Sequence, residues 1–266
     1  MKDIHFCKYQ ATGNDFILID NRSDFFPKQD NKFISHLCNR HFGIGSDGLI
    51  LIENDPENDF RMVFFNPDAS QSMCGNGGRC AVAFAHKLGI VDVSTQFVAI
   101  DGLHQANISD NGIIRLKMND VEKVEKTRKY VRLNTGSPHH VEIRKDVEAI
   151  DVKKEGAKIR YGHSIEGINV NFVEQMDNGQ FKVRTYERGV EDETYSCGTG
   201  AVAVAIAMHK IGKNTAENVV LQTRGGVLEV SFEIKKKLLG LKKEYENIWL
   251  SGGVQFVFQG NIQCDF

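Results

Sequence analysis

The chain has 266 residues, which suits one large domain or two domains of about 130 residues each. Apolar residues make up 41% and charged residues 26%, a composition typical of folded globular proteins that excludes wholesale disorder and collagen-like repeats. Lys and Arg number 33 and Asp and Glu 35, so the net charge of −2 provides no global positive field for nucleic acid or an anionic membrane.

The first half is predicted to contain short strands and two helices. Residues 1–10, MKDIHFCKYQ, are charged and mixed, so no secretory signal is expected. Apolar side chains recur at helical spacing over Lys32–Arg40, and Gly43 is suited to end that helix. A second helix is predicted from Cys74 to Leu88. Strands bounded by turn residues are expected over His5–Lys8, Phe16–Asp20, Asp59–Phe65, Phe97–Ile100, Gln105–Ile108 and Ile113–Met118.

The second half is predicted to contain a helix that is buried on all sides. This helix runs from Cys197 to Ile211, and its segment Ala201–Met208 is apolar on every face, although far shorter than the roughly 20 residues of a membrane span. Ala81–Ala85 in the first half is nearly the same. A sheet wrapped around each helix would bury it. Strands are expected over His140–Ile143, Phe181–Tyr186, Val219–Gln222, Val227–Ile234 and Asn247–Leu250.

An internal repeat links the two halves at a constant offset of 123 residues. The segment CGNG from Cys74 matches CGTG from Cys197, and HKLG from His86 matches HKIG from His209. At the same offset, Thr12 matches Thr135. The sequence therefore predicts an α/β fold of the α+β type, with two pseudo-symmetric domains that each wrap a curved mixed or antiparallel sheet around a central buried helix.

The domain boundary is expected within residues 120–131, which are charged and carry little apolar content. Residues 1–122 would form the first domain, joined by a C-terminal strand from residues 254–266, and residues 123–253 would form the second. With no secretory signal expected, the few cysteines point to free thiols in the reducing cytoplasm rather than to a disulfide scaffold. They are Cys7, Cys38, Cys74, Cys80, Cys197 and Cys264.

Each repeat places a cysteine at the start of its central helix. The unpaired N–H groups and the dipole of a helix N-terminus stabilise a thiolate, and the Gly-x-Gly that follows leaves these N–H groups open to a ligand. Pseudo-twofold duplication would make Cys74 and Cys197 face each other across a bound carboxylate. Such a pair could invert a stereocentre, because one thiolate removes the Cα proton while the opposite thiol delivers another.

Three other interpretations of the cysteines stay open at this point. An isolated cysteine is most often a small core residue, as we expect for Cys38 and Cys80. A zinc site is disfavoured because Cys74, Cys80 and Cys197 form no CxxC or HxxxH spacing. Cys74 and Cys197 could also form a redox disulfide, which we expect only as a side reaction.

Four stretches in chain order resemble the diaminopimelate epimerase family. They are TGNDF at Thr12–Phe16, FNPDAS followed by MCGNGGRC at Phe65–Cys80, YERGV at Tyr186–Val190 and SCGTGA at Ser196–Ala201. The resemblance covers nearly the whole chain. It implies an amino-acid epimerase that interconverts LL- and meso-2,6-diaminopimelate, in lysine and peptidoglycan precursor biosynthesis, without pyridoxal phosphate or another cofactor and without a metal.

The resemblance also implies a role for each matching position. Cys74 and Cys197 would be the acid and base, and His139 and Glu187 would support catalysis. The substrate is implied to contact Asn14, Asn66, Gly75, Asn76, Asn169, Glu187, Arg188, Gly198 and Thr199. A cytoplasmic homodimer is expected, with a small-molecule substrate and with neither nucleic acid nor membrane as a partner.

Two positions depart from the family pattern. Gly48 stands where many members carry Gln, so one side-chain contact is missing or replaced, and Ser137 stands where many carry Asn, with a shorter reach. One alternative function is a related racemase for proline or hydroxyproline, which Asn76 and the pair Glu187–Arg188 disfavour. The other is an amino-acid-binding or thiol redox module, which has no need of thiols at both helix starts.

Overall fold

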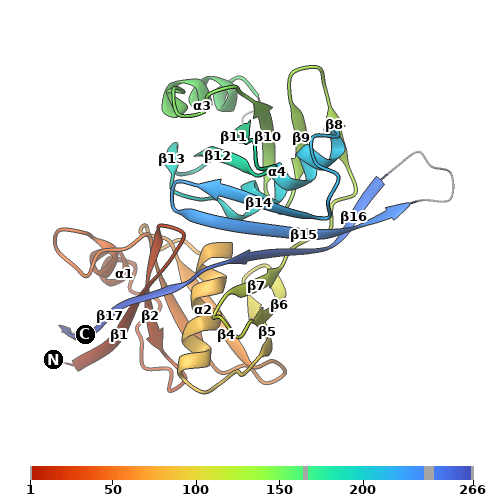
Figure 1. The fold of residues 1–266 in the computed structure, drawn as a ribbon. Coiled ribbons are helices and arrows are strands. Elements are labelled where there is room, and N and C mark those ends of the chain that lie inside the picture. The colour runs from red at the N-terminus through yellow and green to blue at the C-terminus, as the bar shows by residue number, and fades with distance from the viewer. Residues whose placement is uncertain (1, 164–166, 237–242, 265–266) are drawn as a thin grey trace. The chain divides into compact units, whose positions relative to one another are not determined.

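The computed structural model describes residues 2–163, 167–236 and 243–264 (Figure 1). The chain divides into two compact units, Met1–Leu116 with Gly253–Phe266, and Lys117–Gly252. The chain enters the second unit after Leu116, a few residues before the charged stretch 120–131. Among the described residues, no helix is both long and apolar enough to cross a membrane.

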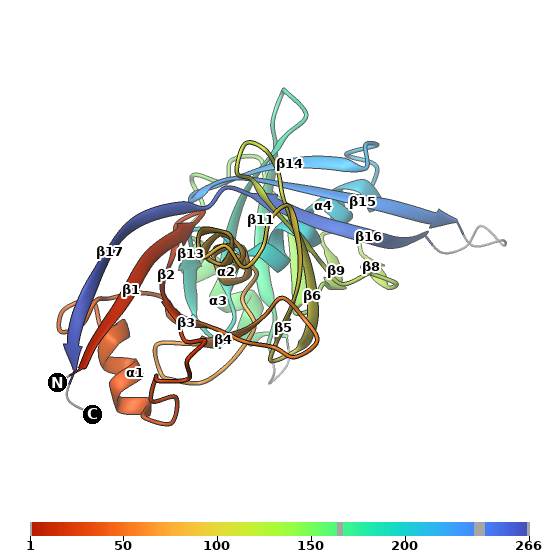
Figure 2. The ribbon, with the colours of Figure 1, turned by 90° about the horizontal axis from the view of Figure 1, so that it is seen from below.

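The first unit is one mixed sheet with two helices. In Figure 2, β17 runs beside β1, and Lys2 pairs with Cys264 in an antiparallel ladder. The strand order is β17-β1-β2-β3-β4-β5-β6-β7. The strands are β1 (Lys2–Ala11), β2 (Asn14–Asp20), β3 (Gly48–Glu53), β4 (Phe60–Phe65), β5 (Ser94–Ala99), β6 (Gly102–Ile108), β7 (Ile114–Lys117) and β17 (Gln255–Cys264), and the helices are α1 (Asn31–Cys38) and α2 (Gly75–Lys87).

The second unit has the same construction. Its neighbouring strands are β8-β9-β10-β11-β12-β14-β15-β16, and the short β13 lies beside β12. The strands are β8 (Val124–Lys126), β9 (Val131–Asn134), β10 (Pro138–Ile143), β11 (Asn169–Gln175), β12 (Phe181–Glu187), β13 (Asp192–Thr194), β14 (Asn218–Thr223), β15 (Gly226–Lys236) and β16 (Lys243–Gly252), and the helices are α3 (Val152–Tyr161) and α4 (Gly198–Lys210).

The two units share one topology as well as one sequence repeat. From β1 to β7 the successive pairings are antiparallel, parallel, antiparallel, parallel, antiparallel and antiparallel. The pairings from β9 to β16 follow the same order when the short β13 is left aside. Helices α2 and α4 begin and end at positions 123 residues apart. The predicted fold class, two pseudo-symmetric α/β halves, is therefore confirmed.

The central helix of each unit is enclosed by its own sheet. Helix α4 contacts seven strands of the second unit, and its residues from Gly200 to His209 are buried. Helix α2 contacts β1, β2, β3, β4 and β6 of the first unit. The absence of a polar stripe on Ala201–Met208 thus correctly predicts burial on all sides.

A second helix packs on the outer face of each sheet. Helix α1 buries Ile34 and Leu37 in an apolar cluster with residues of β1, β2 and β3, so β2 and β3 are covered on both faces. Helix α3 places Val152 in a cluster with Phe172 and Tyr186. The sequence analysis did not predict α3 or the strands β3, β8, β9, β11 and β13.

The close packing of β3 explains why glycine stands at position 48. A Cβ added to Gly48 would overlap the Phe64 ring and lie 2.7 Å from the carbonyl oxygen of Phe65. No side chain fits there unless β3 or Phe64 moves.

We therefore expect Gly48→Gln, which introduces the residue common in the family, to lower the free energy of unfolding by about 1–3 kcal/mol through overpacking. Gly253→Ala is the matched control, because a Cβ there would meet nothing within 4 Å. Urea unfolding of both variants measures the effect. Equal stability of Gly48→Gln and the parent chain would show that the glycine is not required by packing.

Candidate active site

The first half-site is built at the N-terminus of α2. Cys74 is the N-cap residue, with extended backbone (φ −127°, ψ 120°), and the Gly77 N–H donates to its Sγ at 3.5 Å. The thiol in turn donates to Oδ1 of Asn14, also at 3.5 Å. Because the first N–H groups of a helix have no partners within the helix, this position suits both a thiolate and a bound carboxylate.

Two asparagines and an arginine surround this thiol. Asn14 lies at the start of β2, where its Nδ2 donates to Asp47 at 2.6 Å and its Oδ1 also accepts from Nδ2 of Asn76 at 3.2 Å. Arg79 donates from Nη2 to Oδ1 of Asn76 at 2.9 Å and to the Thr12 hydroxyl at 3.3 Å. These bonds hold the Asn76 amide in one orientation, in the first turn of α2 and two residues from the N-cap cysteine.

Arg79 is a cation in the interior of the first unit. Its side chain is fully buried, and within the described residues its Nε and Nη1 have no hydrogen-bond partner. Burial lowers the pKa of Arg79, although a guanidinium stays charged in proteins. Arg79 therefore brings positive potential to the start of α2.

The second half-site has the same backbone and different side chains. Cys197 is the N-cap residue of α4, with nearly the same extended backbone (φ −124°, ψ 116°). Its Sγ lies 3.5 Å from Oγ1 of Thr199, which lies 2.9 Å from Nε2 of His139 on β10. Thr135 donates its hydroxyl to the Thr199 carbonyl at 2.9 Å and so holds the first turn of the helix against the end of β9.

His139 is an uncharged imidazole in this site. Its side chain is fully buried, and burial together with the charge of Arg188 lowers the pKa of His139 to about 3. A neutral ring has one N–H donor and one acceptor nitrogen. His139 can therefore carry a hydrogen bond in a defined direction without adding charge beside the thiol.

Two predicted substrate-contact residues meet beside His139: Asn169, the first residue of β11, and Arg188, which directly follows the end of β12. Asn169 donates from Nδ2 to Ser137 Oγ at 2.8 Å and to the Pro138 carbonyl oxygen at 3.3 Å. Its Oδ1 accepts a hydrogen bond from the backbone N–H of Arg188 at 2.9 Å. The Arg188 side chain donates from Nη2 to Ser137 Oγ at 3.5 Å. The shorter serine thus still takes part in this network.

Two of the predicted site residues, Asn66 and Glu187, form hydrogen bonds with residues near them in sequence. Asn66 donates from Nδ2 to the hydroxyls of Ser70 and Ser72 at 3.0 and 3.1 Å, inside its own turn. Glu187, at the end of β12, accepts from the Thr194 hydroxyl at 2.5 Å. The backbone positions Gly75 and Gly198 are the first residues of α2 and α4, as their motif requires.

Sequence analysis missed two polar residues that contact these half-sites, Arg79 and Asn171. Asn171 lies on β11, is fully buried, and bonds from Nδ2 to Nδ1 of His139 at 3.1 Å. A signal for Arg79 was available, because this charged residue stands in the middle of α2, between Gly78 and the apolar run Cys80–Ala85, opposite Val202 in the repeat.

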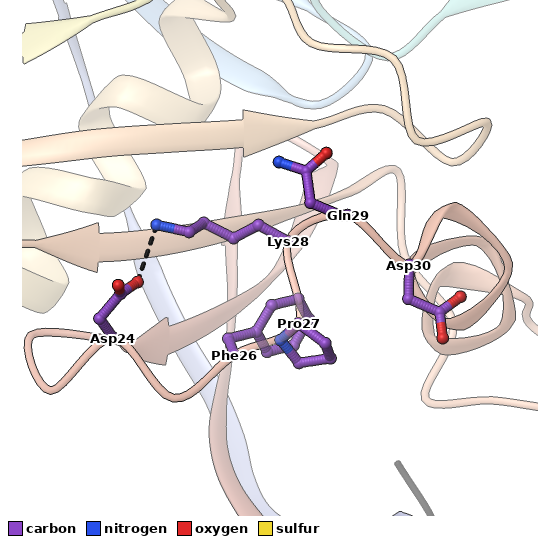
Figure 3. A pocket seen from close by; sticks show the side chains of 6 residues that line it. All are labelled: Asp24, Phe26, Pro27, Lys28, Gln29 and Asp30. Carbon is purple, nitrogen blue, oxygen red and sulfur yellow. Dashed lines mark ion pairs between the residues drawn. The ribbon is translucent and has the colours of Figure 1, made fainter.

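Other candidate sites carry no comparable chemistry. Figure 3 shows a surface hollow in the segment between β2 and α1, lined by Asp24 and residues 26–30, where Lys28 pairs with Asp24 at 2.8 Å. Lys28 also pairs with Glu53 at 2.9 Å. The described part of the chain contains no group of three or more His, Cys, Asp or Glu side chains that could hold a metal ion. Cys7, Cys38, Cys74, Cys80 and Cys197 are thiols, not disulfides.

Comparison with known proteins decides the family. The model of the family described as diaminopimelate epimerase matches residues 6–124 and 131–244. The chain belongs to the diaminopimelate epimerase family. A diaminopimelate epimerase from Flavobacterium psychrophilum is 55% identical over 258 residues, which cover 96% of this chain and 98% of the relative. One from Aquifex aeolicus is 39% identical, with coverage of 97% and 98%. The predicted resemblance is confirmed.

Solved structures extend the likeness of the fold beyond the epimerase family. A phenazine biosynthesis protein of the PhzF family from Bacillus anthracis has a TM-score of 0.77 at 13% identity, covering 99% of this chain and all of its own. A hydroxyproline epimerase from Agrobacterium vitis, with bound trans-4-hydroxy-L-proline, has a TM-score of 0.70 at 13% identity, with coverage of 98% and 92%. At this identity the likeness concerns the fold alone.

The buried neutral His139 predicts a pH dependence of stability. In the unfolded chain a histidine has a pKa of about 6.5, whereas the pKa of His139 in the folded chain is about 3. Between these values only the unfolded chain binds the proton, so the stabilising contribution is complete above pH 6.5 and is lost as the pH falls. The loss is about 1.4 kcal/mol per pH unit below pH 6.

His139→Gln removes this titration and keeps side-chain hydrogen bonding. We expect the stability difference between the parent chain and this variant to shrink steadily from pH 6.5 to pH 4.5 in urea unfolding. Parallel stability curves over this range would contradict a buried, neutral His139.

Proposed function

We propose that this chain interconverts LL- and meso-2,6-diaminopimelate by moving the Cα proton between Cys74 and Cys197, without a cofactor. The observation that supports this most strongly is the duplicated N-cap cysteine. Two homologous units present a thiol at the same position, the first residue before a buried helix, in a chain that belongs to an epimerase family. A protein that only binds an amino acid needs no thiol at either place.

The proposed reaction balances with the two thiols alone. One cysteine, as thiolate, takes the Cα proton, and the electron pair of the broken C–H bond moves into the adjacent carboxylate as an enediolate. The other cysteine, as thiol, protonates Cα from the opposite face and is left as the thiolate. The N–H groups at the starts of α2 and α4, together with Asn76 and Thr199, are suited to hold the charge that develops on the carboxylate.

Selection of diaminopimelate is assigned to the polar side chains around the thiols. The substrate has a second ammonium and a second carboxylate, and a guanidinium such as that of Arg188 binds a carboxylate through two parallel N–H donors. Asn14, Asn66, Asn169 and Glu187 supply amide and carboxylate groups for the remaining contacts. A substrate that lacks the distal groups would leave these side chains unpaired, which disfavours its binding.

The cellular setting is part of the same proposal. An epimerase that makes meso-diaminopimelate would act in lysine and peptidoglycan precursor biosynthesis. Reduced cysteines favour a cytoplasmic location, and the family resemblance favours a homodimer.

Replacement of either N-cap cysteine tests the two-thiol assignment. With LL-diaminopimelate and reduced protein, we expect Cys74→Ala and Cys197→Ala each to lower the rate of meso formation by at least about a thousandfold, since each removes one of the two proton carriers. Chiral chromatography of the product measures the rate. Cys80→Ala is the matched control: it replaces a buried cysteine of α2 by the residue that α4 carries at the repeat-equivalent position 203.

Three outcomes would change the proposal. Full activity after loss of one N-cap cysteine would exclude the two-thiol mechanism. Turnover of proline or hydroxyproline but not of diaminopimelate would keep the mechanism and replace the substrate. No turnover of any amino acid by the fully reduced parent chain would favour a binding or redox module.

A further inference from the structure

The two half-sites differ in chemistry at positions that the repeat makes equivalent. At the offset of 123 residues, His139 corresponds to Phe16, and Asn171 corresponds to Gly48. All four are buried, so the second unit carries a polar pair where the first has an aromatic ring and a glycine. Burial of polar groups is costly unless they bond to each other, which indicates that the polar pair serves a purpose specific to Cys197.

The orientation of the Asn171 amide is fixed by its neighbours. Its Nδ2 donates to the carbonyl oxygen of His140 at 3.1 Å, and its Oδ1 accepts from the Thr185 hydroxyl at 3.0 Å. A carbonyl oxygen only accepts hydrogen bonds, so Nδ2 must be the atom on that side. The same Nδ2 lies 3.1 Å from Nδ1 of His139. Nδ1 therefore faces a donor.

This contact selects the tautomer of His139. A neutral imidazole whose Nδ1 accepts a hydrogen bond must carry its proton on Nε2. Nε2 lies 2.9 Å from Oγ1 of Thr199 and can donate to it. Asn169 Nδ2 also lies 3.4 Å from Nε2, but its hydrogen bonds to Ser137 and Pro138 are the shorter ones. The Thr199 hydroxyl is therefore the acceptor for this proton.

The tautomer then sets the direction of the Thr199 hydroxyl. Because Oγ1 accepts from Nε2–H, its own hydrogen is available to the next acceptor, and Cys197 Sγ lies 3.5 Å away. We propose that Asn171 is a positioning residue that holds His139 as the Nε2–H tautomer, so that Thr199 donates a hydrogen bond to Cys197 Sγ. Hydrogen bonding of this direction stabilises a thiolate, the form that Cys197 takes after it protonates Cα.

The Asn171 side chain packs closely against the first turn of α4. A Cβ added to Gly200, in the first turn of α4, would lie 2.6 Å from Asn171 Oδ1 and 3.3 Å from Cys197 Sγ. The second glycine of the CGTG motif thus lets both the asparagine and the thiol approach the helix backbone. The part of this inference that concerns proton transfer rests on the proposed function; the tautomer of His139 does not.

NMR of the full-length parent chain, labelled with ¹⁵N-histidine and measured near pH 7, tests directly which nitrogen of His139 carries the proton. The His139→Gln variant identifies the His139 signal, because that signal is then missing. We expect the shifts of a neutral ring protonated at Nε2. A ring protonated at Nδ1, or at both nitrogens, would overturn the proposal. This measurement needs no Asn171 variant and no activity, so it stands even if the chain does not act on diaminopimelate.

Asn171→Asp tests the consequence for turnover. A carboxylate accepts hydrogen bonds, so we expect the His139 proton to move to Nδ1 and kcat with LL-diaminopimelate to fall at least about tenfold, with a smaller change in KM. Asn178→Asp, the same substitution in an exposed turn of the same unit, should leave both unchanged. In a Thr199→Val background, where the donor to Sγ is already absent, Asn171→Asp should add little further loss.

Two results would contradict this coupling. If Asn171→Asp moves the proton but leaves kcat unchanged, Asn171 is not a positioning residue for catalysis. If Asn171→Asp costs as much without the Thr199 hydroxyl as with it, Asn171 acts by another route. Should Asn171→Asp fail to fold, Asn171→Ser keeps a polar group in a smaller side chain and is measured in the same way.

Discussion

The rest of the structure depends on burying one apolar helix on all sides within each unit. Helices α2 and α4 are covered by the strands around them, and α4 is buried from Gly200 to His209, so its first turn is the part suited to meet a ligand. There the N–H groups have no helical partners, and only a small N-cap residue followed by glycines leaves them open to a ligand. The same constraint acts twice, so the duplicated fold presents two equivalent thiols.

Equivalent scaffolds do not make equivalent half-sites. The first unit surrounds Cys74 with amides and the buried cation Arg79, whereas the second surrounds Cys197 with a hydroxyl and a neutral imidazole. Both environments favour a thiolate, the first through a full positive charge and the second through a single hydrogen bond from an uncharged hydroxyl. In an enzyme that works in both directions, such a difference would decide which cysteine is charged before the substrate binds.

The sequence predicts those parts of the fold that local pattern determines. The bounds of α2 and α4 follow from the flanking glycines and the uninterrupted apolar segments between them, and the repeat follows from the constant offset. Helix α3 was not predicted because it is largely polar and buries only Val152 and Gly156, so it has no clear apolar face. Strand β3 reads as an uninterrupted apolar run, which gives no alternation because α1 and α2 cover it from both sides. These features depend on packing between distant segments.

The candidate site, like the fold, has residues that sequence motifs predict and residues that only long-range packing brings together. Cys74 and Cys197 could be predicted because a motif and a repeat mark them. The contacts of Asn171 with β10 and β12, and that of Arg79 with Thr12, could not be predicted, since they are hydrogen bonds between elements distant in sequence. The turn bonds of Asn66 are likewise visible only in the folded chain.

The central claim, that two thiols share the proton transfer, is tested most directly by the isotope content of product and substrate early in turnover. With LL-diaminopimelate in D2O, the account predicts that newly formed meso isomer carries deuterium at the inverted Cα, because the delivering thiol has exchanged with solvent. The remaining LL isomer should still be unlabelled. Meso product that retains the original proton would require a single carrier for removal and return, and would contradict the account.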